Sequence, residues 1–176
     1  MRKVILFIAM SLDGYIADKN GSVDWLRGQC NEVENEDTYS EFIKNIDTVI
    51  MGWTTYYQVT TELSPSEWVY SDFISYVITH NEQASTENIK FVNETPSNLV
   101  RRLKKENGKD IWICGGASIA QQLMQDGLVD GFHISIIPTI LGSGIRLFGT
   151  LDAELKLKLL ATRNYNGIME VVYEKR

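Results

Sequence analysis

The feature that most constrains this chain is an unbroken apolar run near its start, at residues 4–10. A strand with one face in water alternates apolar and polar residues, whereas an unbroken run is typical of a strand covered on both faces. Further strand-like segments occur at residues 48–51, 75–79, 89–92, 111–114 and 132–137. The chain is therefore expected to build one sheet with a layer of other structure on each side.

Helix-like segments lie between these strands. Apolar residues with the spacing of one helix face occur at Tyr39, Phe42, Ile43 and Ile46. Thr95 followed by Pro96 is typical of a helix start, and another helix is expected after residues 115–116. Because strands and helices alternate up to residue 137, the sequence predicts a mostly parallel sheet with helices on both faces.

The end of the chain has a different pattern. Residues 156–163 and 168–175 are strand-like and flank Asn166-Gly167, a strong signal for a tight hairpin turn. This hairpin is expected to add antiparallel strands at one edge of the sheet. The sequence contains no linker or repeat, so residues 1–176 are expected to form a single three-layer α/β domain.

Composition excludes several classes of protein. The net charge of -6 disfavours a nucleic-acid partner, because phosphate binding needs clustered Lys and Arg. The apolar runs fall short of the roughly 20 residues that cross a membrane. The two cysteines, Cys30 and Cys114, form no CxxC pair and show no zinc spacing with the two histidines, so no metal is expected. This cysteine usage favours a reducing, cytoplasmic location.

Three segments follow expected parallel strands, at the sheet edge where ligands bind in such folds. They are residues 11–17, 51–56 and 115–119. Two of them place small or polar residues before a helix, where free N–H groups and the helix dipole attract phosphate. Alternatives remain: Gly115-Gly116 as a tight connection, Thr54 and Thr55 as helix caps, and Asp13-Gly14 as a turn. The G-x-G-x-x-G fingerprint of ordinary dinucleotide folds is absent.

Taken together, these segments resemble a known superfamily. The stretches AMSLDGYIA, VIMGWTTY, IWICGGASI and PTILGSGIRLF begin at residues 9, 49, 111 and 138. They are similar in order and spacing to dihydrofolate-reductase-like proteins, in particular to the C-terminal reductase domain of bacterial riboflavin biosynthesis. The resemblance covers nearly the whole chain. It implies an NADPH-dependent oxidoreductase that transfers hydride to a small pterin- or pyrimidine-like heterocycle.

The resemblance also implies positions for the cofactor. Ala9 and Ile16 would line the nicotinamide end, and Thr79 and His80 would border the adenosine ribose. The pyrophosphate region would be held by Gly52, Trp53, Thr54 and Thr55 and by the helix start at Gly115, Gly116, Ala117, Ser118 and Ile119.

Two positions depart from the family pattern. Trp53 stands where relatives usually have the Arg that reaches the 2′-phosphate of NADPH, so NADH is a possible cofactor and weak discrimination between the two is expected. Trp53 would either stack on adenine or pack in the protein. Tyr15 stands where riboflavin reductases have Lys, which makes a ribose-phosphate pyrimidine substrate less favoured.

The candidate proton donor is Glu36 or, with a shift of one residue, Asp37. The alternative for both is a solvated acid at a helix N-terminus. Asp13 and Trp25 are the candidate substrate-binding residues, and a core position is the alternative for Trp25. A non-catalytic nucleotide- or ligand-binding protein on the same fold is the alternative function.

A homodimer through the C-terminal region is expected, because long apolar sheet edges invite association. The apolar residues proposed to contribute are Phe132, Ile134, Ile136, Ile140, Leu147 and Phe148. The alternative is a monomer whose terminal strands are covered by residues 60–72, which are expected to form a loop.

Overall fold

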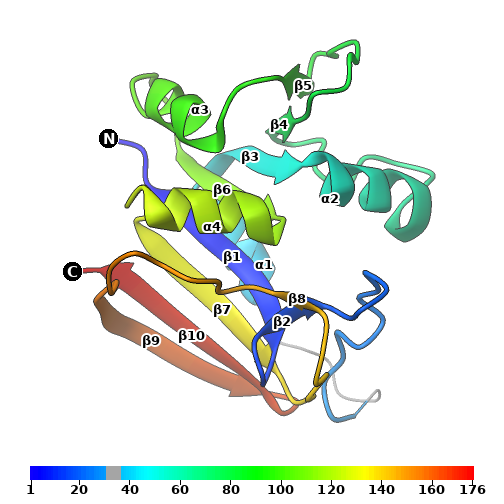
Figure 1. Cartoon of the computed structure of the whole chain (residues 1–176), viewed down its shortest axis with the longest axis vertical. Coiled ribbons are helices and arrows are strands. Elements are labelled where there is room, and N and C mark those ends of the chain that lie inside the picture. The colour runs from blue at the N-terminus through cyan, green and yellow to red at the C-terminus, as the bar shows by residue number, and fades with distance from the viewer. Residues whose placement is uncertain (31–36) are drawn as a thin grey trace.

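The computed structural model describes residues 1–30 and 37–176, and its main feature is one large sheet (Figure 1). In the described residues eight strands run in the order β5-β4-β3-β6-β1-β7-β10-β9. They are β1 (Val4–Ser11), β3 (Ile46–Gly52), β4 (Ile74–Ile78), β5 (Ile89–Val92), β6 (Asp110–Gly115), β7 (Gly131–Ile137), β9 (Leu157–Tyr165) and β10 (Ile168–Lys175). All neighbours from β5 to β7 are parallel, whereas β10 is antiparallel to both β7 and β9. The prediction of a mostly parallel sheet with an antiparallel C-terminal hairpin is confirmed.

Helices cover both faces of this sheet. Helices α3 (Pro96–Leu103) and α4 (Ala117–Gln125) lie on one face, and α1 (Thr38–Ile43) lies on the other (Figure 1). Alternate residues of β6 pack against the helices on the two faces of the sheet, because successive side chains of a strand point to opposite faces. Ile113 packs in the core beneath α3 and α4, and Trp112 packs with Phe42 of α1. This two-sided burial explains the unbroken apolar run of β1.

The helix starts follow local capping chemistry. The Thr95 side chain accepts a hydrogen bond from the Asn98 N–H at 3.2 Å, as expected for the Thr-Pro start of α3. Helix α2 (Trp53–Gln58) instead begins after Gly52, which supplies no side-chain cap. The interpretation of Thr54 as a cap is therefore wrong, because Thr54 lies inside the first turn.

Residues 60–72 are more ordered than the expected loop. The backbone continues from α2 into a helical turn of π type, η1 (Val59–Leu63). Further on, the ring of Trp68 lies 5.5 Å from that of Tyr56 and 5.2 Å from that of Tyr70. These aromatic contacts hold the segment beside α2 and β4, at the opposite side of the sheet from the C-terminal hairpin. It therefore does not cover the terminal strands.

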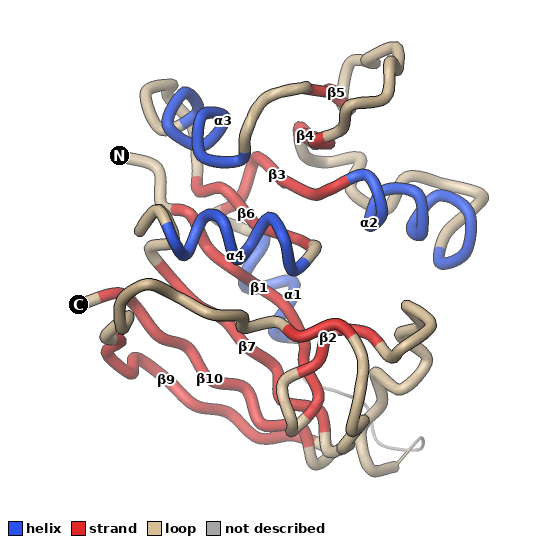
Figure 2. Tube along the Cα trace, viewed as in Figure 1, coloured by secondary structure: helices blue, strands red, loops and turns tan. Residues whose placement is uncertain are grey.

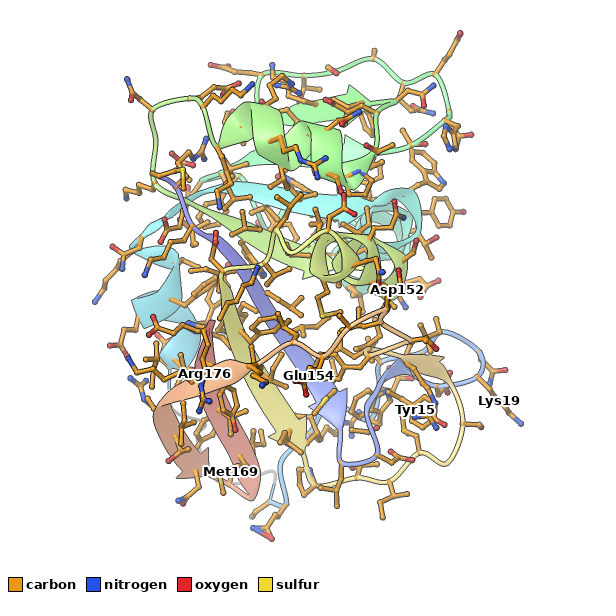
Figure 3. The ribbon with its side chains drawn as sticks, turned by 60° about the vertical axis from the view of Figure 1, so that its left-hand side comes forward. Tyr15, Lys19, Asp152, Glu154, Met169 and Arg176 are labelled. Atoms are coloured by element: carbon orange, nitrogen blue, oxygen red, sulfur yellow. The ribbon has the colours of Figure 1, made fainter. Side chains whose placement is uncertain are left out.

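A small second sheet crosses the carboxyl end of β1 (Figure 2). It pairs β2 (Tyr15–Ala17) with β8 (Ile145–Arg146), and the Arg146 guanidinium lies 4.7 Å from the centre of the Tyr15 ring. Figure 3 marks Tyr15 in this corner of the molecule. This sheet fixes residues 12–22 above the edge where the main strands end.

The apolar residues near the C-terminus divide between core and surface. Phe132, Ile134 and Leu147 are buried in the core under α4. Their expected contribution to a dimer surface is wrong, because the α3 and α4 layer covers them. Ile136 is partly buried against the same core, while Ile140 and Phe148 are exposed. In the described part of the chain, helices long and apolar enough to cross a membrane are absent.

Candidate active site

A continuous cleft of about 1170 Å³ runs along the carboxyl ends of β1, β3 and β6. Its walls come from the ends of these strands, the starts of α2 and α4, and the loop of residues 20–26. Most of the expected cofactor positions line it: Ala9, Ile16, Gly52, Trp53, Thr54, Thr55, His80, Gly115, Gly116, Ala117, Ser118 and Ile119. Twelve positions from five separate segments of the sequence thus meet at one surface.

The start of α4 lines the cleft. Gly116 is the N-cap residue, and it gives the first N–H groups of α4 no side-chain partner. A Cβ atom at Gly115 would lie 3.1 Å from Thr55 Oγ1, so this glycine lets α2 pack close to β6. The result is a helix N-terminus whose backbone donors and positive dipole end are open to an anion.

Cys114 and Tyr70 line the cleft on the face of the sheet that carries α1. Here the Sγ atom of Cys114, the residue before Gly115, is 3.2 Å from the hydroxyl oxygen of Tyr70. Burial raises the pKa of the Cys114 thiol to about 11, and burial also raises the pKa of the Tyr70 hydroxyl well above its ordinary value. Both groups are therefore protonated at physiological pH.

The charges around the cleft are negative. Among the described residues that line it, Glu62 and Glu94 carry charge and there is no Lys or Arg. Glu94 makes an ion pair of 2.6 Å with Arg102, which is outside the lining. At the same end, the Nδ1 atom of His80 lies 2.7 Å from Asn93 Oδ1. A ligand phosphate would rely on backbone N–H groups in this cleft.

The aromatic ring of Trp53 forms one wall at the start of α2. It lies 5.5 Å from the ring of Tyr56 and 6.3 Å from that of Phe91, with tilted ring planes. Trp53 also faces the cleft, so it both packs in the protein and offers apolar surface to a ligand.

Asp37, one of the two expected proton donors, lies outside the lining of the cleft. Asp37 is the N-cap residue of α1, and its carboxylate accepts a hydrogen bond from the Ser40 N–H at 2.9 Å. Hydrogen bonds from Ser40 lower the pKa of Asp37, which keeps its carboxylate ionised. The geometry matches the alternative interpretation, a solvated acid at a helix N-terminus. Glu36 lies outside the described residues.

Three other expected site residues also lie outside the lining of the cleft. Asp13 accepts hydrogen bonds from the Ser11 hydroxyl and from the N–H groups of Leu141 and Gly142. The Trp25 indole donates to the Ser22 carbonyl at 3.2 Å, and buried Thr79 accepts from the Asn81 N–H. These side chains shape the loops beside the cleft.

The sequence reasoning did not identify Tyr70, Glu94 or Cys114 as residues of the cleft. Tyr70 lies in a segment without helical or strand periodicity, so its sequence gave no signal. Cys114 lies directly before Gly115-Gly116 on an expected buried strand. Its position at the carboxyl end of that strand was the signal available.

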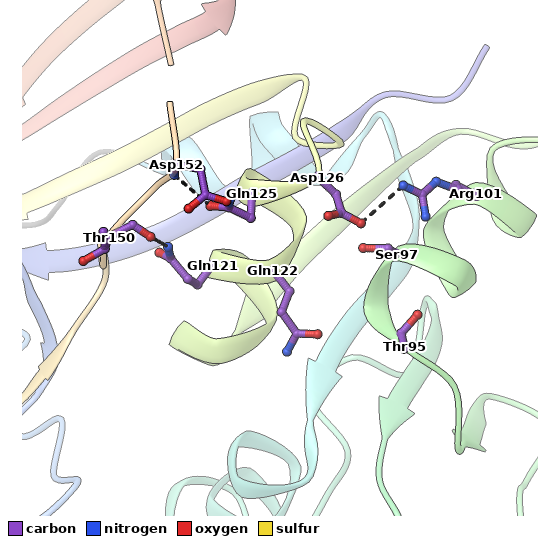
Figure 4. A pocket seen from close by; sticks show the side chains of 9 residues that line it. All are labelled: Thr95, Ser97, Arg101, Gln121, Gln122, Gln125, Asp126, Thr150 and Asp152. Carbon is purple, nitrogen blue, oxygen red and sulfur yellow. Dashed lines mark hydrogen bonds and ion pairs between the residues drawn. The ribbon is translucent and has the colours of Figure 1, made fainter. Parts of the chain in front are cut away.

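A second, polar groove of about 540 Å³ separates α3 from α4 (Figure 4). Arg101 pairs with Asp126 across it at 3.2 Å, and the Gln121 amide donates to the Thr150 carbonyl at 2.5 Å. Gln125 bonds to Asp152 beside them. These contacts attach the segment after β8 to α4. Groups of three or more His, Cys, Asp or Glu that fit a metal ion are absent from residues 1–30 and 37–176.

Comparison with known proteins identifies relatives of this chain in sequence and in structure. A family model for the RibD C-terminal domain matches residues 2–169. The uncharacterized protein YwjB of Bacillus subtilis (strain 168) is 41% identical over 173 residues, which cover 98% of this chain and 97% of YwjB. A solved Shewanella sp. PV-4 protein named for riboflavin biosynthesis superposes with a TM-score of 0.82, at 26% identity and 99% coverage of both chains.

The fold also matches a more distant structure. Dihydrofolate reductase from Enterococcus faecalis, solved with NADP(H), superposes with a TM-score of 0.66 at 14% identity, covering 98% of this chain and 96% of the reductase. This likeness shows a dihydrofolate-reductase-like fold. The match of the family model over residues 2–169 establishes that the chain belongs to the RibD C-terminal domain family, and its fold is of reductase type.

Proposed function

We propose that this protein is an NAD(P)H-dependent reductase that transfers hydride to a small heterocycle of pterin or pyrimidine type. The observation that carries the proposal is the single cleft that joins the open N-terminus of α4 to the inner end beside β1. Its volume of about 1170 Å³ exceeds the roughly 300–1,000 Å³ of a typical small-molecule pocket. Two ligands lying side by side would account for this size.

The residues present fit a nicotinamide dinucleotide. The pyrophosphate would lie against Gly116 and the first turn of α4, where backbone N–H groups are available. Trp53 and His80 would border the adenosine end, and Ala9 and Ile16 the nicotinamide end. When bound, the nicotinamide supplies the hydride. The Enterococcus faecalis reductase of the same fold was solved with NADP(H), which supports this choice.

The chain's own residues would orient the two rings and exclude water. Ile8, Ala9 and Ile16 give the inner cleft an apolar floor, and Val23 and Leu26 border it from the loop above. Such an apolar lining lets a planar ring stack against the cofactor. It also excludes water, which strengthens the few polar contacts that the ligand can make. Because Lys and Arg are absent from the described lining, NADH should bind at least as well as NADPH.

A non-catalytic ligand-binding role is the second candidate. It is favoured by one observation: Asp37, a candidate proton donor, caps α1 instead of lining the cleft. On this alternative the cofactor or a related nucleotide binds, but no hydride moves.

Two measurements in sequence separate these functions. Calorimetry with NADH and NADPH tests binding, and absence of binding of both would contradict the proposal. Loss of the nicotinamide absorbance in single-turnover mixtures with a panel of pterins and pyrimidines then tests hydride transfer. Tight cofactor binding without turnover by any member of the panel would favour the non-catalytic role.

We also propose that the protein is a homodimer that associates through its C-terminal strands. The half-exposed apolar side chains of β9 and β10 support this proposal. Leu159 and Leu160 are 51% and 53% exposed, and Met169 is 42% exposed. Figure 3 marks Met169 on this hairpin.

A further inference from the structure

The lining of the cleft holds a polar pair whose use the proposed function leaves open. Tyr70 comes from the segment before β4 and Cys114 from the end of β6, and their side chains meet at 3.2 Å in the wall of the cleft. They are 44 residues apart in the sequence. The pair lies on the face of the sheet opposite α4.

The Tyr70 ring is held in place by two indoles. It lies edge-to-face with Trp68 at 5.2 Å and with Trp112 at 5.3 Å between ring centres. These contacts fix the direction of the ring, and the Cys114 contact fixes its polar end. The hydroxyl is therefore presented to the cleft with little freedom, as a preorganised ligand contact requires.

The hydrogen-bond count shows that the pair has one hydrogen atom to spare. The Tyr70 oxygen and the Cys114 sulfur each carry one hydrogen, and only one of the two can lie between them. When the thiol donates to the Tyr70 oxygen, the Tyr70 hydrogen is left for an acceptor on a ligand in the cleft. A ligand that accepts this hydrogen gains affinity, because both hydrogens of the pair are then used in hydrogen bonds.

We propose that the Tyr70 hydroxyl donates a hydrogen bond that positions the substrate, and that the substrate presents an uncharged acceptor, a carbonyl oxygen or ring nitrogen, on the edge facing it. Cys114 is the positioning residue that orients this hydroxyl. The inference rests on the proposed function and names the substrate class: a neutral heterocycle without a phosphate. The described lining holds no Lys or Arg, and the N-terminus of α4 would be taken by the pyrophosphate of the cofactor, so a second anionic group, on the substrate, is disfavoured.

Protonation agrees with a donor role. Burial raises the pKa of the Tyr70 hydroxyl, and Cys114 raises it further. Tyr70 thus stays neutral across the physiological range and acts as a hydrogen-bond donor, without giving up its proton. Substrate affinity should therefore be independent of the Tyr70 ionisation between about pH 6 and pH 9.

The test compares Tyr70→Phe with wild type, with pterin and uracil as two uncharged carbonyl-bearing probes added to the NADH-bound protein. Removal of the hydroxyl should weaken binding of the better probe roughly three- to tenfold. Binding of NADH and the unfolding midpoint should stay unchanged, because the ring and its indole contacts remain. The matched control is Tyr39→Phe, a tyrosine 5.8 Å from the same Trp112 ring but outside the cleft lining. It should leave the affinity of the probes unchanged.

A second pair of variants tests the thiol. Cys114→Ala should lose part of the probe affinity, and Cys114→Ser should restore it, because a hydroxyl donates as the thiol does. A lost cavity contact alone would not be rescued by the smaller, polar serine.

The outcomes separate this inference from the proposed function. Unchanged probe affinity in Tyr70→Phe, or no binding of either probe to the NADH-bound wild type, would overturn the inference. If wild type fails to bind both NADH and NADPH, the proposed function itself fails. Cofactor binding with no effect of Tyr70→Phe would overturn the inference alone.

Discussion

The hydroxyl group of Thr55 lies directly against the backbone of Gly115. A β-carbon built on Gly115 would come within 3.1 Å of Thr55 Oγ1 and 3.4 Å of its methyl carbon. On Gly116 the β-carbon would meet the same Oγ1 atom at 3.5 Å, an ordinary contact. Packing against Thr55 therefore requires glycine at position 115. At position 116 the protein leaves room for a β-carbon, and we expect a ligand to use that space.

These two glycines give the first prediction. Gly115→Ala should lower the free energy of unfolding by about 1–3 kcal/mol, because Thr55 and α2 must shift. Gly116→Ala should keep the wild-type stability within about 0.5 kcal/mol. Its backbone, with φ of -94°, suits alanine.

The same variants separate folding from binding. Gly116→Ala should weaken NADH binding roughly tenfold or more, since the added methyl group would stand where the pyrophosphate approaches α4, a loss of about 1.4 kcal/mol. Calorimetry and thermal unfolding measure both quantities. Wild-type cofactor affinity in a folded Gly116→Ala protein would contradict the placement of the pyrophosphate.

The second prediction concerns Trp53. Trp53→Arg should shift the preference toward NADPH by about 1–2 kcal/mol, because a guanidinium can make charge-assisted hydrogen bonds with the 2′-phosphate. Titration of both cofactors against wild type and variant gives the ratio of dissociation constants. Trp53→Gln is the matched control without charge. If wild type already prefers NADPH by several hundredfold, a cationic residue at another position binds the 2′-phosphate, and the argument from Trp53 fails.

The third prediction concerns Asp13 and pH. Hydrogen bonds, above all from Ser11 and also from Gly142 and Leu141, lower the pKa of Asp13 from 3.8 to about 2. Because the folded pKa is depressed, its stabilising contribution is complete above the unfolded value near 4 and is lost as the pH falls toward 2.

Urea unfolding of wild type and Asp13→Asn between pH 7 and pH 2.5 measures this contribution. Wild type should be more stable at neutral pH, and the difference should shrink below about pH 4. Exposed Glu82→Gln serves as a control. A stability difference that stays constant across this range would show that the carboxylate charge is not what stabilises the loop at residues 139–142.

The fourth prediction concerns assembly. Light scattering at micromolar concentration should give twice the 20.0 kDa mass of one chain. Leu160→Glu, on the exposed strand β9, should shift the protein toward monomer because it would bury a charge in the interface. Val69→Glu, an exposed apolar position at the other side of the sheet, should leave the mass unchanged. A wild-type mass near one chain at all concentrations would exclude the dimer.

Much of the fold could be predicted because its signals are local. The unbroken apolar run predicted the doubly covered β1, Thr95-Pro96 predicted the start of α3, and Asn166-Gly167 predicted the terminal hairpin. In the structure both turn residues have positive φ, 47° and 76°, as such a turn requires. Each of these signals depends on a few neighbouring residues and their backbone preferences.

The roles of individual polar side chains were harder to predict from the sequence. Asp13 and Asp37 looked suited to a ligand site, but each carboxylate accepts hydrogen bonds from nearby N–H groups. A carboxylate satisfies the nearest donors first, and only the loop geometry shows where those donors are. Sequence spacing could not distinguish a cap from a catalytic acid.

The sequence by itself determined the succession of the main-sheet strands and their helices along the chain, the two-sided burial of β1 and the small residues that open α4. Only the tertiary structure decided that β6 lies between β1 and β3, and that residues 60–72 fold back beside α2. Those two facts bring Tyr70 to Cys114, 44 residues away. The reason is physical: strand order and loop packing are set by the burial of the whole apolar surface at once, which no local pattern records.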